Sequence, residues 1–268
     1  MPELPEVETV KRSLAPHLQG RTIERVVFHW PRTCAGDPDE TSARLAGQRI
    51  DEVGRYGKYL LFRLSKHGRG SFLWIHLRMT GNLLLNALPG PYTRAEMFLC
   101  GGTNVVFHDI RKFGKWQWSP GFPERLAQLG PEPLEIDSRD FAKRLSGRST
   151  RLKALLLNQE FVRGLGNIYA DEALFRARLH PERSAASVSP RKARALHKAI
   201  RDVLQESISA GGTSIHNYVD GQGSPGYFQL RTQVYGKTGQ PCASCRAPLR
   251  RIIVAQRSTH YCPRCQRR

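Results

Sequence analysis

The sequence predicts an α+β fold of several domains: an N-terminal β-sandwich with a helix in front of it, a helical domain, and a small C-terminal β-hairpin. Short β-branched and aromatic runs, separated by turn residues, fill residues 22–118. Helical periodicity takes over near residue 138. Two Cys-x-x-Cys pairs lie close to the end of the chain. A length of 268 residues is enough for two or three such modules.

The charge balance of the chain indicates a polyanionic partner. The sequence holds 42 Lys and Arg residues against 23 Asp and Glu, a formal net charge of +19. Solubility or a membrane surface are alternative reasons, but basic residues interleaved with aromatics favour nucleic acid. No apolar run approaches the ~18 residues of a membrane span, and no leader precedes the body. We therefore expect a cytoplasmic protein, in which the six cysteines are poor disulfide candidates.

The first helix is predicted from about Pro5 to Gly20. Proline suits the first turn, where its missing N–H costs nothing, and the acids Glu6 and Glu8 favour the positive helix start. Gly20 ends the periodic pattern. The apolar face comprises Val7, Val10, Leu14 and Leu18. Such a helix would fix the N-terminus against a core.

The residues before this helix predict a nucleophile. Because proline at position 2 is small, Met1 can be removed, which would leave the secondary ring amine of Pro2 at the start of the chain. An α-amino group titrates near about 8, so a useful fraction is neutral at neutral pH and can form Schiff bases. Glu3 is a candidate proton donor beside it, and Glu6 can hydrogen-bond the same neighbourhood. The alternative is a disordered terminus followed by ordinary helix-start acids.

Short strands separated by turns predict the sandwich. Lys58 follows Gly57 at the start of one strand, and taken alone it is a solvated lysine at a strand end. A Pro- and Gly-rich stretch at residues 128–137 predicts a linker, so we place domains at 1–130, 131–225 and 226–268. The predicted strands are Thr22–Phe28, Arg49–Val53, Tyr59–Leu64, Phe72–Leu77, Asn82–Asn86, Met97–Leu99 and Val105–His108.

The helical domain contains a glycine-rich turn before one of its helices. Gly164 and Gly166 allow close backbone approach to a phosphate, and Asn167 then begins a helix whose free N–H groups favour anions. An ordinary helix cap is the alternative. A polar, Gly-rich segment at 214–226 predicts a mobile loop or a plain linker. The predicted helices are Ser138–Leu145, Arg151–Asn158, Asn167–Arg176 and Pro190–Ala210.

The cysteines of the tail are the most specific signal in the sequence. Two Cys-x-x-Cys pairs separated by sixteen residues have the spacing of a four-thiolate zinc site. Four thiolates leave the metal no open position, so the zinc should be structural. Cys34 and Cys100 lie apart and are predicted to be ordinary thiols. The predicted ligands are Cys242, Cys245, Cys262 and Cys265.

Five stretches together resemble the bacterial formamidopyrimidine-DNA glycosylases, the oxidised-purine branch of the Fpg/Nei family. They are Met1–Val10, Gly57–Tyr59, Ile75–Leu77, Gly164–Glu172 and the cysteine pairs, so the resemblance spans nearly the whole chain. It implies a helix-two-turn-helix domain, a zinc finger, and a flap at residues 214–226 that closes over the oxidised base. The implied function is a bifunctional DNA glycosylase and abasic-site lyase of base excision repair, which removes 8-oxoguanine and formamidopyrimidines through a Schiff base and β,δ-elimination.

The resemblance also implies roles for single residues. Pro2 would be the nucleophile and Glu3 the acid, while Lys58 and Arg257 would contact phosphates at the lesion and assist proton transfer and elimination. The implied partner is double-stranded DNA with oxidised bases or abasic sites, bound by a monomer in the bacterial cytoplasm at the nucleoid. The implied DNA contacts are Met79, Tyr92, Arg111, Phe113, Arg148, Lys153 and Asn167.

Met79, Arg111 and Phe113 form what we call the void-filling trio. In the family these side chains enter the duplex as the damaged base leaves it, which offsets a few kcal/mol of lost stacking. Taken alone, Met79 and Phe113 are more often core residues. They lie in two loops, Arg78–Gly81 and Asp109–Gly114, each of which follows a predicted strand.

The sequence departs from the family pattern at several loops. Arg78 stands where Gly is usual, Ile110 where Pro is usual, and Arg163 where a small apolar residue is usual. A His-x-His near Tyr92 is also absent. Two alternatives stay open: an oxidised-pyrimidine (Nei-type) glycosylase, against which Leu4 and the complete trio argue, and a zinc-containing DNA-binding protein without catalysis. A retained Met1 would make the Pro2 nitrogen an amide and prevent catalysis.

Overall fold

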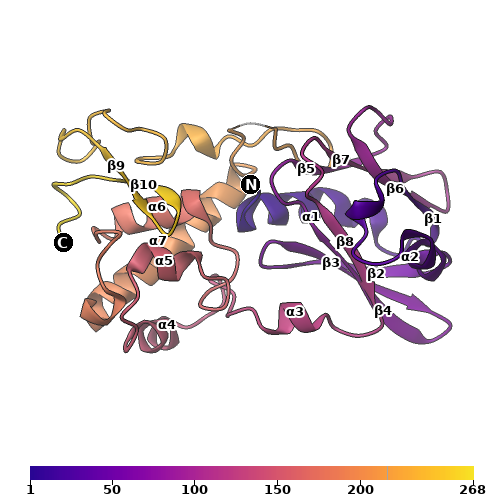
Figure 1. The fold of residues 1–268 in the computed structure, drawn as a ribbon, viewed down its shortest axis with the longest axis horizontal. Coiled ribbons are helices and arrows are strands. Elements are labelled where there is room, and N and C mark those ends of the chain that lie inside the picture. Colours follow the sequence, from indigo (N-terminus) through magenta and orange to yellow (C-terminus); the bar gives the residue numbers. More distant parts are fainter. Residues whose placement is uncertain (216) are drawn as a thin grey trace. The chain divides into compact units, whose positions relative to one another are not determined.

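The computed structural model describes residues 1–215 and 217–268, which form two compact units (Figure 1). The N-terminal unit comprises residues 1–128 and 210–227, and the C-terminal unit comprises residues 129–209 and 228–268. Residues 210–227, predicted to lie mostly in the helical domain, thus pack with the N-terminal part of the chain.

Helix α1 (Leu4–Leu18) opens the N-terminal unit. Glu3 and Glu6 form a reciprocal capping box, in which the Glu3 N–H donates to Glu6 Oε2 at 2.7 Å. The predicted apolar face is confirmed, because Val7, Val10, Leu14 and Leu18 are fully buried. Gln19 is extended and Gly20 has a φ of +81°, a conformation that favours glycine, so the helix ends where the sequence predicts.

Two antiparallel four-stranded sheets form the predicted sandwich. Their strand orders are β1-β6-β7-β5 and β2-β3-β4-β8. Residues of both sheets and of α1 share one hydrophobic core, in which Phe62, Phe107 and Trp116 are fully buried. The strands are β1 (Ile23–Phe28), β2 (Arg49–Tyr56), β3 (Tyr59–Lys66), β4 (Arg69–His76), β5 (Gly81–Leu85), β6 (Thr93–Leu99), β7 (Asn104–Asp109) and β8 (Lys115–Ser119).

The sequence did not predict some elements of this unit. Strand β8 pairs with β4, but its sequence Lys-Trp-Gln-Trp-Ser is short and partly polar. Helix α2 (Pro38–Leu45) buries only Thr41 and Leu45, which is too few for a clear period. The 3₁₀ turn η1 (Pro31–Thr33) and the short helix α3 (Glu124–Ala127) complete the unit.

The C-terminal unit contains a helical part and a hairpin. Its helices are α4 (Ser138–Leu145), α5 (Leu152–Leu157), α6 (Asn167–Arg176) and α7 (Pro190–Ser209), close to the predicted ranges. Helices α4 and α6 both pack on α7, and Tyr169 and Ser207 share a hydrogen bond of 2.7 Å between their hydroxyls. Two 3₁₀ turns, η2 (Ala185–Ser187) and η3 (Phe228–Leu230), precede the antiparallel strands β9 (Arg250–Val254) and β10 (Arg257–Tyr261). In the described parts of the chain, no helix combines the length and the apolar character that crossing a bilayer requires.

Candidate active site and nucleic-acid interface

The start of α1 is fixed in place. Pro2 is buried, and the side chain of Glu6 spans two segments: one carboxylate oxygen accepts the Glu3 N–H, and the other accepts the Thr213 N–H at 2.8 Å. The Tyr218 hydroxyl donates to the Glu6 carbonyl at 3.2 Å. Glu3 itself is only 3% exposed. The residues that the sequence singled out as nucleophile and acid therefore belong to the packed part of the unit.

The segment 210–227 is anchored to α1 and β5. The Gly221 N–H donates to Ser13 Oγ at 2.8 Å, and a Cβ at this glycine would lie 2.6 Å from a Leu14 methyl. The side chain of Asn82 donates to the Asn217 carbonyl at 2.8 Å and accepts from the Val219 N–H at 3.3 Å. Position 216, within the segment predicted as a flap over the base, lies outside the described residues. The flap therefore remains a prediction, but the described residues around position 216 are held against α1 and β5.

Lys58 lies in the turn between β2 and β3 and is only 6% exposed. Arg55 connects this turn to α1, because its guanidinium donates to Glu8 Oε2 at 3.0 Å and to the Gly57 carbonyl at 3.1 Å. Burial opposes ionisation of Glu8, but hydrogen bonds from Arg12 and Arg55 outweigh it and hold the Glu8 pKa below its ordinary value. An ionised Glu8 thus fixes the turn that carries Lys58 relative to the helix that carries Pro2.

His76 is a site residue whose role the sequence did not show. Burial, followed by the charges of Arg78 and Lys58, lowers the pKa of His76 to about 3, so its ring is neutral at neutral pH. Its Nδ1 accepts the Arg78 N–H at 2.9 Å, which fixes the first residue of the turn before Met79. The ring packs edge-on against Tyr59, with centroids 4.6 Å apart. The neutral imidazole therefore supports the loop of the void-filling trio.

Asp109 joins the two loops of the trio. Its carboxylate is 1% exposed and accepts the Thr80 hydroxyl at 2.5 Å, the Arg111 N–H at 3.2 Å and the Gly114 N–H at 2.7 Å. The Thr80 hydroxyl also accepts the Arg111 N–H, at 3.0 Å. The buried carboxylate of Asp109 thus sets the relative position of both loops. Nothing in the sequence indicated this role, because Asp109 is simply the residue before Ile110.

The apolar members of the trio lie at the surface. Met79 is 41% and Phe113 is 49% exposed, so the expectation that each taken alone is a core residue is wrong. The Arg111 guanidinium lies 4.9 Å from the centroid of the Phe113 ring. Tyr92 is also exposed, and its carbonyl accepts the Asp109 N–H at 2.9 Å. The structure thus brings together four of the predicted DNA contacts on loops that meet at Asp109.

The structure bears on two of the departures from the family pattern. Arg78 has a φ of +56°, a left-handed conformation in which glycine is more stable by roughly 1 kcal/mol. Arg163 pairs with the buried Glu132 at 3.1 Å and donates to the Gly130 carbonyl at 3.0 Å, so it fixes the segment before α4. Nothing in the structure explains the isoleucine at Ile110.

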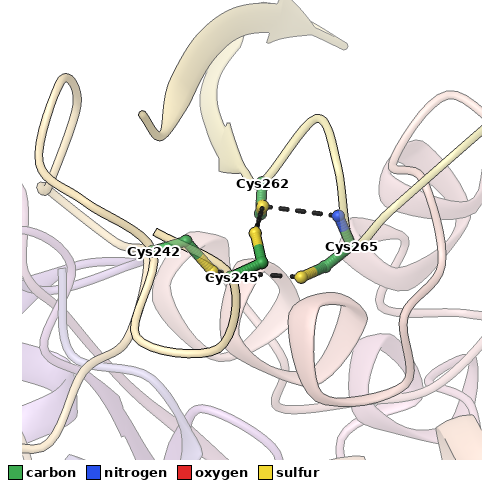
Figure 2. A group of neighbouring side chains, drawn as sticks. All are labelled: Cys242, Cys245, Cys262 and Cys265. Atoms are coloured by element: carbon green, nitrogen blue, oxygen red, sulfur yellow. Dashed lines mark hydrogen bonds between the residues drawn. The ribbon is translucent and has the colours of Figure 1, made fainter. Parts of the chain in front are cut away.

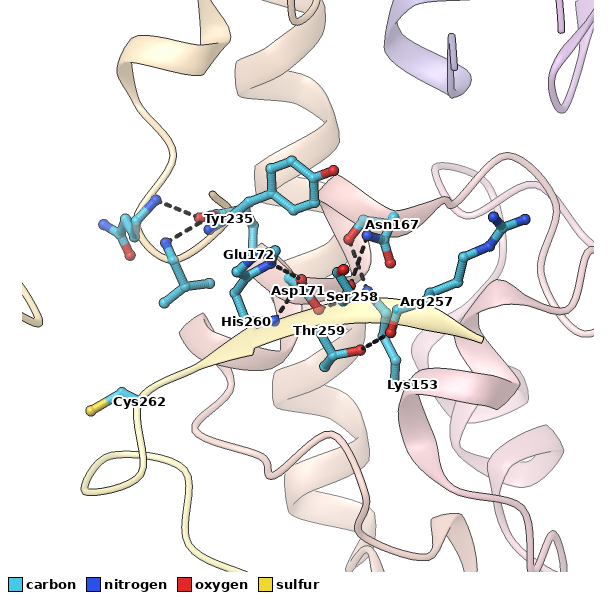
Figure 3. A network of polar contacts seen from close by, with 12 residues as sticks. Lys153, Asn167, Asp171, Glu172, Tyr235, Arg257, Ser258, Thr259, His260 and Cys262 are labelled. Atoms are coloured by element: carbon cyan, nitrogen blue, oxygen red, sulfur yellow. Dashed lines mark hydrogen bonds and ion pairs between the residues drawn. The ribbon is translucent and has the colours of Figure 1, made fainter. Parts of the chain in front are cut away.

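Asn167 begins α6 in the C-terminal unit. Gly164 has a φ of +92° and Gly166 is the extended N-cap, so the backbone turns tightly before the helix, as the two glycines predict. The Asn167 side chain donates to the Ser258 carbonyl at 2.8 Å, beside Arg257 (Figure 3). A side-chain amide has two N–H donors, and this carbonyl takes one of them. The contact places two predicted phosphate-binding residues, Asn167 and Arg257, on neighbouring elements.

The structure does not support Lys153 as a direct phosphate contact. Its side chain is fully buried, and its ammonium lies 2.6 Å from Asp171 Oδ1 and 2.9 Å from the Asn167 carbonyl. The other carboxylate oxygen of Asp171 accepts the His260 N–H at 2.9 Å and lies 3.0 Å from His260 Nδ1 (Figure 3). Lys153 therefore belongs to a buried network that holds α5, α6 and β10 together, and it can act on DNA only through these elements.

Glu172 fixes the chain that enters the hairpin module. It is fully buried, and its carboxylate accepts the N–H groups of Gln233, Val234 and Tyr235 at 2.8–2.9 Å. Burial raises the pKa of Glu172, and these three hydrogen bonds oppose that rise. Glu172, the residue after Asp171, thus holds residues 233–235 against α6.

Arg148 and Arg257 are exposed, as the predicted phosphate contacts require. Arg148 lies in the loop between α4 and α5, and Arg257 is the first residue of β10. Before it, Ala255 and Gln256 have φ values of +49° and +61°, the pattern of a two-residue type I′ hairpin turn. The tight turn leaves the Arg257 side chain at the tip of the hairpin.

The four tail cysteines form a metal site. Their sulfur atoms all lie within 4.8 Å of one another, with separations of 3.9 Å for Cys242–Cys265 and 3.4 Å for Cys245–Cys262 (Figure 2). Tetrahedral zinc with Zn–S bonds of about 2.3 Å requires sulfurs about 3.8 Å apart, so the cluster fits zinc. Four thiolates complete its coordination, and the chain therefore binds one structural zinc. A small core of Phe175, Val234 and Leu249 surrounds Cys242 and Cys262.

Comparison with known families assigns all three modules. Residues 1–116 match the formamidopyrimidine-DNA glycosylase N-terminal domain, and residues 129–219 match the H2TH domain of the same proteins. Residues 239–268 match the zinc finger found in FPG and IleRS. The formamidopyrimidine-DNA glycosylase of Solibacter usitatus is 52% identical over 269 residues and covers both chains completely. The Bacillus subtilis enzyme is 42% identical over 277 residues, with 99% of each chain covered.

Solved structures show the same fold. A Lactococcus lactis FPG mutant, in complex with DNA that contains Fapy-dG, matches with a TM-score of 0.90 at 35% identity, and all of both chains is covered. The MutM (FPG) protein of Thermus thermophilus matches with a TM-score of 0.89 at 44% identity, over 99% of this chain and 98% of that one. Full-length similarity of sequence and fold shows that the chain belongs to the formamidopyrimidine-DNA glycosylase family.

Proposed function

We propose that this chain, a DNA glycosylase of base excision repair with abasic-site lyase activity, removes oxidised purines with the nitrogen of Pro2 as its nucleophile. The observation that carries the proposal is the fixed start of α1. Pro2 is buried there, and Glu6 holds the Glu3 N–H and the Thr213 N–H with its two carboxylate oxygens. A disordered terminus would lack these hydrogen bonds, whereas a nucleophile must be held in position to react.

The first step requires that Met1 has been removed, which turns the Pro2 nitrogen into a secondary amine. This amine attacks C1′ of the damaged nucleotide, the glycosidic bond breaks, and the oxidised base leaves with a proton. Glu3 protonates the sugar ring oxygen, so the ring opens and an iminium forms between Pro2 and C1′. The iminium then makes the C2′ proton acidic, and β- and δ-elimination release the 3′ and 5′ phosphates in turn.

The phosphate contacts divide between the units. Lys58 in the N-terminal unit and Arg257 in the C-terminal unit would hold phosphates next to the lesion, and Asn167 and Arg148 would hold the backbone nearby. Exposure of Arg148 and Arg257 supports this assignment. Structural neighbours in complex with Fapy-dG DNA and with abasic-site DNA support a duplex substrate of the same kind.

Base extrusion would use the void-filling trio. Met79 and Phe113 are apolar, exposed and held on loops that Asp109 joins, and Arg111 stacks on Phe113. Side chains of this kind can fill the space that a base leaves, so they offset the lost stacking. We further propose that the chain acts as a monomer in the bacterial cytoplasm, at the nucleoid.

The test is a borohydride trap with an 8-oxoguanine duplex. Protein whose intact mass shows the loss of Met1 should form a covalent adduct after reduction, and peptide mapping should place the adduct on Pro2. Blocking of the N-terminal amine should abolish the adduct, and Glu3→Gln should abolish it or slow its formation by at least about 100-fold. Glu24→Gln, a matched change at an exposed position of β1, should leave it intact.

The two alternatives give different outcomes in the same assay. A DNA-binding protein without catalysis would bind the duplex and give no adduct at any enzyme concentration. A glycosylase of oxidised pyrimidines would form its adduct faster on an oxidised-pyrimidine duplex than on 8-oxoguanine. Loss of the adduct in Glu24→Gln would show that the assay reports general damage to the protein, and the role of Glu3 would then be withdrawn.

A further inference from the structure

A strongly basic pocket lies in the C-terminal unit beside the zinc cysteines. It is an open cavity of about 490 Å³ whose lining includes Ser244, Cys245 and Cys265. Six cationic side chains complete the lining: Arg178, Arg183, Lys192, Arg264, Arg267 and Arg268. We propose that this basic pocket binds the phosphate backbone of a second DNA segment, separate from the one that carries the lesion.

The basic pocket and the lesion contacts lie at opposite ends of two neighbouring elements. Helix α6 and strand β10 run in the same direction, because Asn167 contacts Ser258 near both starts and Gln266 contacts the Leu179 carbonyl beyond both ends, at 2.9 Å. Asn167 and Arg257 are their first residues.

The pocket residues follow the ends of these elements. Arg178 lies two residues after α6, and Arg264 lies between two zinc ligands after β10. Ten helical residues span about 15 Å and five strand residues about 16 Å. Figure 3 shows Cys262 at the end of β10 opposite Arg257. The basic pocket therefore lies about 15 Å from Asn167 and Arg257, too far for one phosphate group to contact both.

The charge of the basic pocket exceeds what the protein itself neutralises. Glu182 is the acid beside it, and it pairs with Arg268 and, at 3.1 Å, with Arg151. A zinc ion with four thiolates adds two negative charges. Among side chains and the zinc site alone, six cations against Glu182 and these two charges leave an excess of about three positive charges. The first turn of α7, which carries Lys192, adds the positive end of a 20-residue helix. The six cationic side chains of the basic pocket are therefore more than the zinc site and Glu182 need for neutralisation.

The lining of the basic pocket indicates which part of DNA it would contact. Arginine, lysine, serine and cysteine side chains form the described lining, and no aromatic side chain is among them to stack on a base. Such a surface holds phosphates without regard to sequence. A second backbone held here would let the protein bridge two duplexes and pass between them during its search for lesions.

The experiment measures a ternary complex. The full-length zinc-loaded protein is first saturated with a fluorescent duplex that contains a tetrahydrofuran abasic analogue, and an undamaged duplex with an acceptor dye is then titrated. We expect energy transfer between the dyes and affinity for the second duplex that falls steeply with salt. The variant Lys192→Gln/Arg264→Gln/Arg267→Gln should bind the second duplex at least about tenfold more weakly, with a log–log salt slope smaller by about 2–3. Its affinity for the abasic duplex should stay within about twofold.

A matched variant controls for total charge. Lys143→Gln/Arg139→Gln/Arg194→Gln removes one lysine and two arginines from exposed helix positions of the same unit, outside the basic pocket. This control variant should bind the second duplex with the affinity of the wild type. Zinc content and the thermal midpoint check that each variant folds. Lys192→Gln alone, on α7 and far in sequence from the cysteine pairs, should weaken second-duplex binding by about two- to threefold and reduce the salt slope by about 1.

Five results would overturn the proposal. They are the absence of a ternary complex in the wild-type protein, an unchanged ternary complex in the pocket variants, and an equal loss in the matched control. The fourth is binding of inorganic tripolyphosphate in the pocket without any second duplex, which would identify a site for a small anion. Loss of the abasic duplex in the pocket variants would likewise show that the two sites are not separate.

Discussion

Asp109→Asn should separate the role of the loop geometry from the role of the loop side chains. Asparagine keeps the shape of Asp109 and one acceptor oxygen, so Thr80 and Arg111 can still donate to it. The other oxygen becomes an NH₂ group that faces the Gly114 N–H, so a charge-assisted hydrogen bond of 2.7 Å is replaced by two opposed donors.

The magnitude follows from the burial of the acid. Asp109 is 1% exposed, and a hydrogen bond to a buried charged group contributes about 1.5–3 kcal/mol. Loss of the Gly114 bond, together with the unpaired donors, should lower the free energy of unfolding by about 2–4 kcal/mol. If about 2 kcal/mol of this loss is expressed as disorder of the two loops, base extrusion becomes about 30-fold less favourable.

The assay is single-turnover excision of 8-oxoguanine, followed in parallel with the fluorescence of a 2-aminopurine next to the lesion. Excision should slow by about 10–100-fold in Asp109→Asn, and the fluorescence rise that reports unstacking should decrease. Cleavage of a ready-made abasic site should slow less, because no base has to leave the stack. Asp51→Asn, in the edge strand β2, is the matched control. Full excision activity in a variant that has lost the expected stability would refute the role of Asp109 in ordering the trio.

Three further predictions concern His76, Lys153 and the zinc site. The folded pKa of His76 is about 3, below its unfolded value, so as pH falls from about 6.5 the unfolded chain binds a proton that the folded chain does not bind. The free energy of unfolding should therefore fall by about 1.4 kcal/mol per pH unit more in the wild type than in His76→Gln. Urea unfolding measures this difference, and His17→Gln is the control. Lys153→Met should lower stability by about 3–5 kcal/mol, whereas Arg148→Gln should weaken DNA binding at unchanged stability; the opposite pattern would return Lys153 to the phosphate contacts. Cys265→Ser should release zinc, unfold the hairpin by circular dichroism and weaken binding of abasic DNA, while Cys100→Ser should do none of these.

Patterns that repeat along the chain predicted most of the fold. The apolar face of α1 and the period-two strands report burial directly, and the ranges predicted for α4 and α6 agree with the structure. The zinc site was predictable because its ligands are a fixed residue type at a fixed spacing. Helix α2 was not, since only two of its residues are buried and a short amphipathic helix in a loop has no clear period.

The site was predictable only where a residue acts through its own chemistry. Met79 and Phe113 could not be distinguished from core residues by type, since apolar residues at the surface carry no local signal in the sequence. Lys153 was assigned to phosphate from the family resemblance, but its partner Asp171 is eighteen residues away on another helix. Pairings of this kind depend on tertiary packing, so one sequence cannot show them.

Buried acids explain how so basic a chain presents ordered contacts to DNA. A net charge of +19 attracts phosphate, but it would also leave flexible cations in many orientations. Glu6, Asp109 and Asp171 are at most 2% exposed, and each accepts hydrogen bonds from two or more segments of its own unit. Their charges are therefore kept away from the phosphate backbone while they fix the loops and strands that carry Pro2, Arg111 and Arg257. Replacement of such an acid should change the position of the contacts rather than the attraction to DNA, so it should reduce excision while the salt dependence of binding stays the same.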